Sequence, residues 1–249
     1  MNNIHVVRCD IPSPPELENN METINGNSAT LTSHSRRSVL QWSGGAVATI
    51  AIAGGILPNF GITEAMAADL GKGDIGVLNY AYALEQLEAA FYTKVIDSPY
   101  QDMPDAEKQT LTDIKDHEVE HREFLKKALG GKAIPDLEVD FSKVDFTKRE
   151  SVLGTAKVFE DLGVAAYNGA GKLIKNPDYL TAAGKIVSVE ARHAATIRDL
   201  LKPKSASFAG PDVVDKNGLD GAKPPAAVLK AAGPFIKTKV TANSVVGMK

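Results

Sequence analysis

The sequence predicts an all-α protein, in which four helices form a bundle with one long crossover between the second and third helices and an irregular C-terminal tail. Three observations support this fold class. Apolar residues recur at helical spacing in four segments. The connections run short, long, short, and a long middle connection can cross a bundle. A motif of acids and histidine occurs twice, once in each half of the bundle.

The first predicted helix covers residues 73–97, and Pro99 ends it. We expect Asp102 to cap the second helix and Pro104 to lie in its first turn, where a missing N–H costs nothing. Gly130-Gly131 ends that helix. The first helix carries an apolar face made of Ile75, Leu78, Tyr82, Leu84, Ala89 and Phe91.

The third predicted helix begins near Thr147, because Thr147 and Glu150 have the spacing of a capping box. Asn176 and Pro177 supply a cap and a first turn for the fourth helix. Apolar residues follow both signals at helical spacing. Short connections make helix neighbours antiparallel, so the sequence predicts two antiparallel pairs joined by the long segment from Gly130 onward.

Two Glu-x-x-His pairs, each preceded by a Glu seven residues before a Tyr, interrupt the apolar faces of these helices. Burying an unpaired carboxylate is costly, and several close together cannot all ionise. Two bridged divalent cations remove both objections, and a four-helix bundle presents such a set from four helices. The sequence therefore predicts a dinuclear site with the metal ligands Glu85, Glu118, His121, Glu160, Glu190 and His193.

Three neighbouring residues have open roles. Either Glu85 or Glu88 can supply the ligand of the first helix; we prefer Glu85, which matches Glu160 in its spacing to a Tyr, and Glu88 is then an extra or outer ligand. Asp161 is rotated off the stripe and is expected to be solvated. His117 lies one turn before His121 and is either an outer partner of the metals or a surface residue.

Tyr92 and Tyr167 are the candidate catalytic residues. They can donate hydrogen bonds to the bridging carboxylates or supply electrons, and plain core packing is an equally good interpretation. A single Glu-x-x-His on a helix is usually a surface pair. Two pairs on apolar stripes favour a dinuclear site over a polar bundle core.

The N-terminal region carries the pattern of a twin-arginine export signal. Arg36-Arg37 precedes a mild apolar run over residues 44–57, and Ala65-Met66-Ala67 offers small residues at the cleavage positions. The alternative is a basic pair before a short buried or membrane helix, but the run is too short to span a bilayer comfortably. We therefore expect residues 1–67 to be removed and the protein to be exported to the periplasm or outside the cell by the twin-arginine machinery.

The mature chain would then consist of a bundle over residues 68–202 and a Pro- and Gly-rich tail over residues 203–249, with a short helix near Ala226. Whether Met1 or Met21 is the true start stays open.

The amino-acid composition argues against several kinds of site and partner. Cys9 is the only cysteine and precedes the cleavage point, so the mature chain has no disulfide, thiolate ligand or lipid-anchor cysteine, and we expect no stable membrane anchor. The formal net charge is −3 with both signs scattered, so no basic stripe suggests a nucleic-acid partner. Self-association into a homo-oligomer stays open.

The chain resembles a ferritin-like domain of the exported bacterial type and is similar to desiccation-related ferritin-like proteins. The resemblance covers about residues 73–202 and rests on the stretches 82–92, 116–125, 159–167 and 189–194. It implies a ferritin-like bundle with two iron or manganese ions between the helices. It also implies that Glu118 and either Glu160 or Glu190 share the bridging.

Two departures from better-known relatives limit what the resemblance implies. No fifth helix of the kind that closes a storage cage follows the bundle, and no Cys-rich electron-transfer domain is present in the sequence. We expect a protein that uses O₂ or H₂O₂ as oxidant, oxidising Fe(II) or removing peroxide. The alternatives are a non-enzymatic envelope or stress-related protein, and metal binding without turnover.

Overall fold

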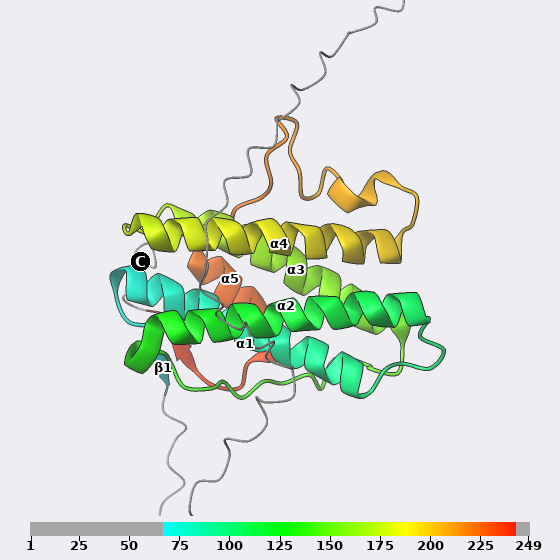
Figure 1. Ribbon diagram of the computed structural model, residues 1–249, viewed down its shortest axis with the longest axis horizontal. Coiled ribbons are helices and arrows are strands. Elements are labelled where there is room, and N and C mark those ends of the chain that lie inside the picture. Colours follow the sequence, from blue (N-terminus) through cyan, green and yellow to red (C-terminus); the bar gives the residue numbers. More distant parts are fainter. Residues whose placement is uncertain (1–66, 243–249) are drawn as a thin grey trace, which may run out of the picture. The chain divides into compact units, whose positions relative to one another are not determined.

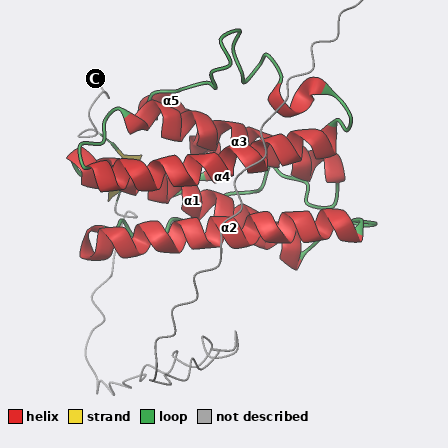
Figure 2. Cartoon of the chain, turned by 45° about the horizontal axis from the view of Figure 1, so that its top comes forward, coloured by secondary structure: helices red, strands yellow, loops and turns green. Residues whose placement is uncertain are grey.

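The computed structural model describes residues 67–242, and in this range four long helices form two pairs, α1 with α2 and α3 with α4 (Figures 1 and 2). The predicted all-α bundle is confirmed. The export pattern lies outside the described residues. The elements are β1 (Ala68–Asp69), α1 (Gly73–Asp97), α2 (Asp105–Leu129), η2 (Gly130–Lys132), α3 (Arg149–Gly171), α4 (Pro177–Leu201), η3 (Ala206–Ala209), α5 (Pro225–Ala232), η4 (Gly233–Phe235) and β2 (Val240–Thr241).

The start of α4 is confirmed and the start of α2 is not. Asn176 caps α4, since its side chain accepts a hydrogen bond of 2.8 Å from the backbone N–H of Asp178. The predicted cap at Asp102 is wrong. Pro104 is the N-cap of α2 and makes no side-chain bond, whereas Asp102 has a positive φ of 59° and belongs to the preceding turn.

The predicted capping box at Thr147 is also wrong. Lys148 is the N-cap of α3, and no side chain bonds to the first turn from that position. The Asp145 carboxylate accepts hydrogen bonds from both the backbone N–H and the hydroxyl of Thr147. Thr147 is therefore held in the turn before the helix and is not free to cap it.

Helix α1 is buried around most of its circumference, because α2, α3 and the crossover all cover it. Two buried amides fasten the crossover to it. The Asn79 amide donates to the carbonyl of Lys132 and accepts from the backbone N–H of Ile134, and the Gln86 side chain accepts from the backbone N–H of Leu137. These bonds pair backbone groups that the crossover would otherwise bury unpaired.

The crossover returns along the bundle, so α3 starts at the end where α2 starts (Figure 1). There the guanidinium of Arg149 binds the buried carboxylate of Glu107 in α2 through two nitrogens. The same guanidinium donates to the carbonyl of Leu200 in α4 at 2.9 Å. One ion pair thus joins three helices at one end of the bundle.

The tail packs on the bundle and includes the predicted short helix, observed as α5. Strand β2 pairs in parallel with β1, with Ala68 opposite Val240. On α5, Val228 and Ala232 are fully buried, and the Phe235 ring contacts the Phe159 ring of α3 edge-on at 4.8 Å between centroids.

A buried arginine fastens the loop before α5. Arg198 of α4 is 3% exposed and binds the Asp161 carboxylate with contacts of 2.7 and 2.8 Å. It also binds the Asp212 carboxylate at 2.8 Å and the Ser207 carbonyl. The prediction that Asp161 is solvated is wrong, because rotation off the metal stripe directs it toward this guanidinium.

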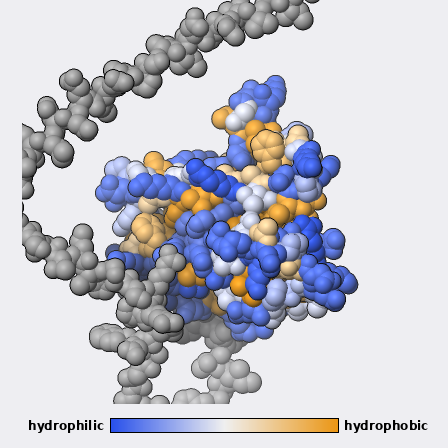
Figure 3. Space-filling model, turned by 45° about the vertical axis from the view of Figure 1, so that its right-hand side comes forward, coloured by the Kyte–Doolittle hydropathy of each residue, from blue (hydrophilic) through white to orange (hydrophobic). Residues whose placement is uncertain are grey.

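On the face drawn in Figure 3, hydrophilic residues predominate and hydrophobic ones appear in patches between them. Across residues 67–242, no helix combines the length and the apolar character that crossing a membrane requires.

The close approach of the tail to α3 yields a stability prediction. The backbone N–H of Lys223 donates to the Ala165 carbonyl at 2.8 Å, and a Cβ at Gly169 would collide with the Lys223 carbonyl. We expect Gly169→Ala to lower the free energy of unfolding by about 1–3 kcal/mol, as overpacking does. Gly184→Ala, at an exposed position of α4 with open space, should raise it by about 0.5–1 kcal/mol. Urea denaturation measures both, and equal shifts would contradict the tail contact.

Candidate metal centre

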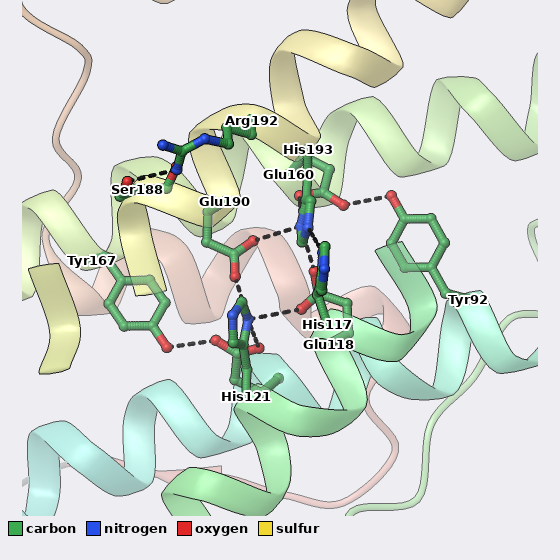
Figure 4. Close-up of polar contacts among 11 residues, drawn as sticks. Tyr92, His117, Glu118, His121, Glu160, Tyr167, Ser188, Glu190, Arg192 and His193 are labelled. Carbon is green, nitrogen blue, oxygen red and sulfur yellow. Dashed lines mark hydrogen bonds and ion pairs between the residues drawn. The ribbon is translucent and has the colours of Figure 1, made fainter. Parts of the chain in front are cut away.

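The six predicted ligands face one interior and come from all four long helices. Figure 4 shows the acids and imidazoles pointing toward one another, with Tyr92 and Tyr167 at opposite ends of the cluster. The side chains of Glu85, Glu118, Glu160 and Glu190 are completely buried. The spacing of three within each Glu-x-x-His pair keeps both members on the buried stripe of a helix.

The ligand atoms form two overlapping groups, in each of which they lie within 4.8 Å of one another. One group contains Glu85, Glu118, His121 and Glu190, and the other contains Glu118, Glu160, Glu190 and His193. Glu118 and Glu190 belong to both groups. The geometry therefore selects Glu118 and Glu190 as the shared acids, and Glu85 and Glu160 as the acids of single groups.

The two groups repeat the same order of distances. His121 Nδ1 lies 2.9 Å from Glu190, 3.5 Å from Glu85 and 3.7 Å from Glu118. His193 Nδ1 lies 2.7 Å from Glu118, 3.5 Å from Glu160 and 3.6 Å from Glu190. Each imidazole approaches the acid of the other motif more closely than the acid of its own. The two sequence motifs thus build two equivalent halves.

The two tyrosines bind the unshared acids. The Tyr92 hydroxyl donates to Glu160 Oε1 at 2.5 Å, and the Tyr167 hydroxyl donates to Glu85 Oε1. Both tyrosines thus bond to carboxylates of the cluster, and the two acids that they bond to each belong to a single group. Each Tyr lies two turns beyond the unshared Glu of its own helix, and from there it reaches across to the unshared Glu of the opposite helix.

The orientation of the buried polar atoms tests whether the site fits metal ions. Within the described range, several buried ligand atoms make no hydrogen bond of acceptable geometry, although they lie close together. They gather within the two groups, and such orphaned buried atoms require a partner. Carboxylate oxygens with imidazole nitrogens suit divalent transition metals. The atoms are Glu85 Oε2, both oxygens of Glu118 and Glu190, Glu160 Oε2 and Nδ1 of His121 and His193.

Comparison with known families agrees with this geometry. Residues 73–203 match the family model described as a ferritin-like domain. The chain belongs to the ferritin-like family. No curated protein sequence matches it. This ferritin-like domain thus carries a buried cluster of acids and histidines that can hold metal ions.

Burial and charge set the protonation of the ferritin-like site in the absence of metal. Burial and repulsion by neighbouring acids raise the pKa of Glu118 well above its usual value. Burial also acts to raise the pKa of Glu190, but the adjacent imidazoles outweigh it and lower that pKa to about 2. Burial opposes protonation of His121 and His193, but the surrounding acids outweigh it and raise both pKa values to about 12. Protons thus balance the acids where cations are absent.

Glu88 is a fifth buried acid beside the two groups, and it belongs to neither. Burial and repulsion by the four other acids raise its pKa well above the usual value, which favours its neutral form. A Cβ at Gly163 would lie 3.3 Å from Glu88 Oε1 and 3.7 Å from Glu190 Oε2. Gly163 of α3 therefore makes room for these two acids.

His117 combines the two roles that the sequence left open. It is exposed, yet its Nδ1 lies 2.9 Å from Nε2 of His193, and the two rings are nearly parallel with 5.2 Å between centroids. The signal available in the sequence was its position one turn before His121, on the same side of α2.

The protonation pattern predicts how metal affinity depends on pH. A metal binds only the unprotonated imidazole, so uptake must displace the protons held by His121 and His193. We expect release of about two protons or more per loaded site near neutral pH, and weaker binding as the pH falls from about 8 to about 6. Titration calorimetry in buffers of different ionisation enthalpy measures the protons, and Glu123→Gln, at an exposed position, is the control. An affinity independent of pH would contradict the assignment of these ligands.

Proposed function

We propose that this ferritin-like protein holds two iron or manganese ions between its four helices and uses O₂ or H₂O₂ as oxidant, oxidising Fe(II) or removing peroxide. One observation carries the proposal: two groups of buried, orphaned ligand atoms share Glu118 and Glu190. A site that shares two acids is suited to two ions held side by side.

The charges of the buried acids also favour two divalent ions in the site. Four ionised carboxylates balance two divalent cations when both imidazoles are neutral and Glu88 keeps its proton. With fewer cations, some of the buried carboxylates would stay uncompensated. Such carboxylates repel one another and must take up protons to remain in the interior. The donor set lacks thiolate and is rich in carboxylate, which suits iron and manganese.

The protein residues have separable tasks in this function. Bound iron or manganese supplies the redox chemistry. Glu118 and Glu190, which belong to both groups, would hold both ions, and His121 and His193 would each hold one. Each tyrosine engages Oε1 of an unshared acid and so leaves Oε2 of that acid directed at its group. The four acids have no exposed surface, so the helix faces keep bulk water away from them.

We expect the mature protein to bind about two metal ions per chain, with a rise in melting temperature. At a thousandfold excess over Kd, binding to the native state alone contributes about 4 kcal/mol, or about 10 °C for a domain of this size. Replacing Glu118 and His121 together with Ala should abolish uptake, and Glu123→Ala, at an exposed position of the same helix, should not. Elemental analysis and thermal melts of chelated and loaded protein provide the measurements.

The outcomes separate the candidate functions. Two ions with consumption of O₂ or H₂O₂ support a redox enzyme, and two ions without consumption indicate binding or storage. No uptake of iron or manganese, with identical melting of chelated and loaded protein, would reject the dinuclear site and leave a non-enzymatic protein with a polar core.

We also propose that the protein is exported by the twin-arginine route. The support is the sequence pattern of Arg36-Arg37, the apolar run and Ala65-Met66-Ala67. Arg36→Lys with Arg37→Lys should leave an uncleaved precursor inside the cell, whereas Lys202→Arg, far along the chain, should not affect processing. Cell fractionation and N-terminal sequencing check this, and the mature form should begin at Ala68. Mature double-lysine protein outside the cytoplasm would refute the route.

A further inference from the structure

We propose that the two halves of the metal centre differ in access: ions enter and leave through a groove over His121, whereas His117 closes the half that contains His193. The inference rests on the proposed dinuclear site and deepens it. It follows from three features, which are the groove, the histidine pair and a difference between the two sequence repeats.

The groove lies between α2 and α4 and offers about 480 Å³ to water-sized molecules. The imidazole of His121 forms part of its lining, and that side chain is 13% exposed, whereas the side chain of His193 is 4% exposed. A ligand that reaches His121 from solvent therefore needs no opening of the helices. Its lining includes Glu120 and His121 of α2 and Asp178, Lys185 and Val189 of α4.

The charges along the groove favour a cation. Glu120 and Asp178 contribute two carboxylates, and Lys185 contributes one ammonium group. The completely buried Glu85, which approaches His121 Nδ1, lies beyond the lining. An incoming divalent ion therefore moves from an acidic mouth toward a more acidic interior, and local negative charge of this kind raises the concentration of cations.

The other half is closed by a histidine pair. His117 Nδ1 lies 2.9 Å from His193 Nε2, and the interplanar angle of the two rings is 8°. If His193 binds a metal through Nδ1, its Nε2 carries the proton. The Nε2–H group then donates a hydrogen bond to Nδ1 of His117. A second partner of this type fixes the orientation of a metal-binding imidazole. His117 is therefore a positioning residue that also covers His193 on its outer side.

The two repeats differ at the position that decides access. His117 immediately precedes Glu118 in the first motif, and Val189 immediately precedes Glu190 in the second. Val189 lines the groove together with His121, and its side chain offers no hydrogen-bonding group. Equivalent positions thus hold a covering imidazole over one half and a short apolar side chain beside the other.

Release of iron to a chelator tests the inference. The whole mature chain, residues 68–249, is loaded anaerobically with Fe(II). A chelator that forms a coloured ferrous complex is then added in excess. We expect a fast phase from the His121 half and a slow phase from the His193 half, with comparable amplitudes. His117→Val should accelerate the slow phase about tenfold, since outer partners of metal ligands have effects of at least that size. His117→Asn, which retains a hydrogen-bonding atom near the position of Nδ1, should restore slow release.

The groove is tested separately by Val189→Trp, which should abolish the fast phase and leave the slow phase unchanged. Val158→Trp is the matched control, because Val158 is 53% exposed on α3 and does not line the groove. Circular dichroism and metal content establish that each variant is folded and loaded. Two ions released in a single phase, or Val189→Trp behaving like Val158→Trp, would overturn the inference. Failure to bind two ions would instead overturn the proposed function.

Discussion

Acids buried together in one helical interior repel one another, and the four helices must compensate this repulsion. Four carboxylates are completely buried there, and Glu88 lies beside them. Without cations, the acids depend on protonated His121 and His193 and on their own raised pKa values. On the proposal that the site holds two divalent cations, the same acids would become ligands and the imidazoles would become neutral. The cluster can therefore exchange protons for metal ions, and both states would require all four helices to stay at fixed separations.

The contacts that fix these separations lie away from the acids. Arg149 joins α2, α3 and α4 at one end of the bundle, and Arg198 ties the loop before α5 to α3 and α4. The tail crosses α3 so closely that only Gly169 fits beneath Lys223. A site that needs ligand atoms placed within fractions of an ångström is thus supported by packing that carries no metal chemistry.

Local patterns in the sequence predicted the long helices and the cluster, because a spacing of three or seven places side chains on one helical stripe wherever the helix lies. The first predicted helix, residues 73–97, has the observed bounds of α1. Which acids are shared and which side chains pair depends instead on tertiary contacts. The choice of Glu118 and Glu190 as shared acids depends on how the helices approach one another, and the pairing of Asp161 with Arg198 depends on how α3 packs against α4. Thr147 failed as a cap because Asp145 already held it.

The internal repeat explains both the likeness and the difference of the two halves. Each unshared Glu is followed seven residues later by a Tyr, and each half reproduces the same order of distances. Three residues after the unshared Glu, however, the first repeat has Glu88 and the second has Gly163. A second acid at that position would add a sixth buried carboxylate to an interior where burial and repulsion already raise the pKa of Glu88, and its side chain would occupy the space that Glu88 and Glu190 fill. The candidate ligands are the same in both repeats, whereas the residues beside them differ where only one copy fits.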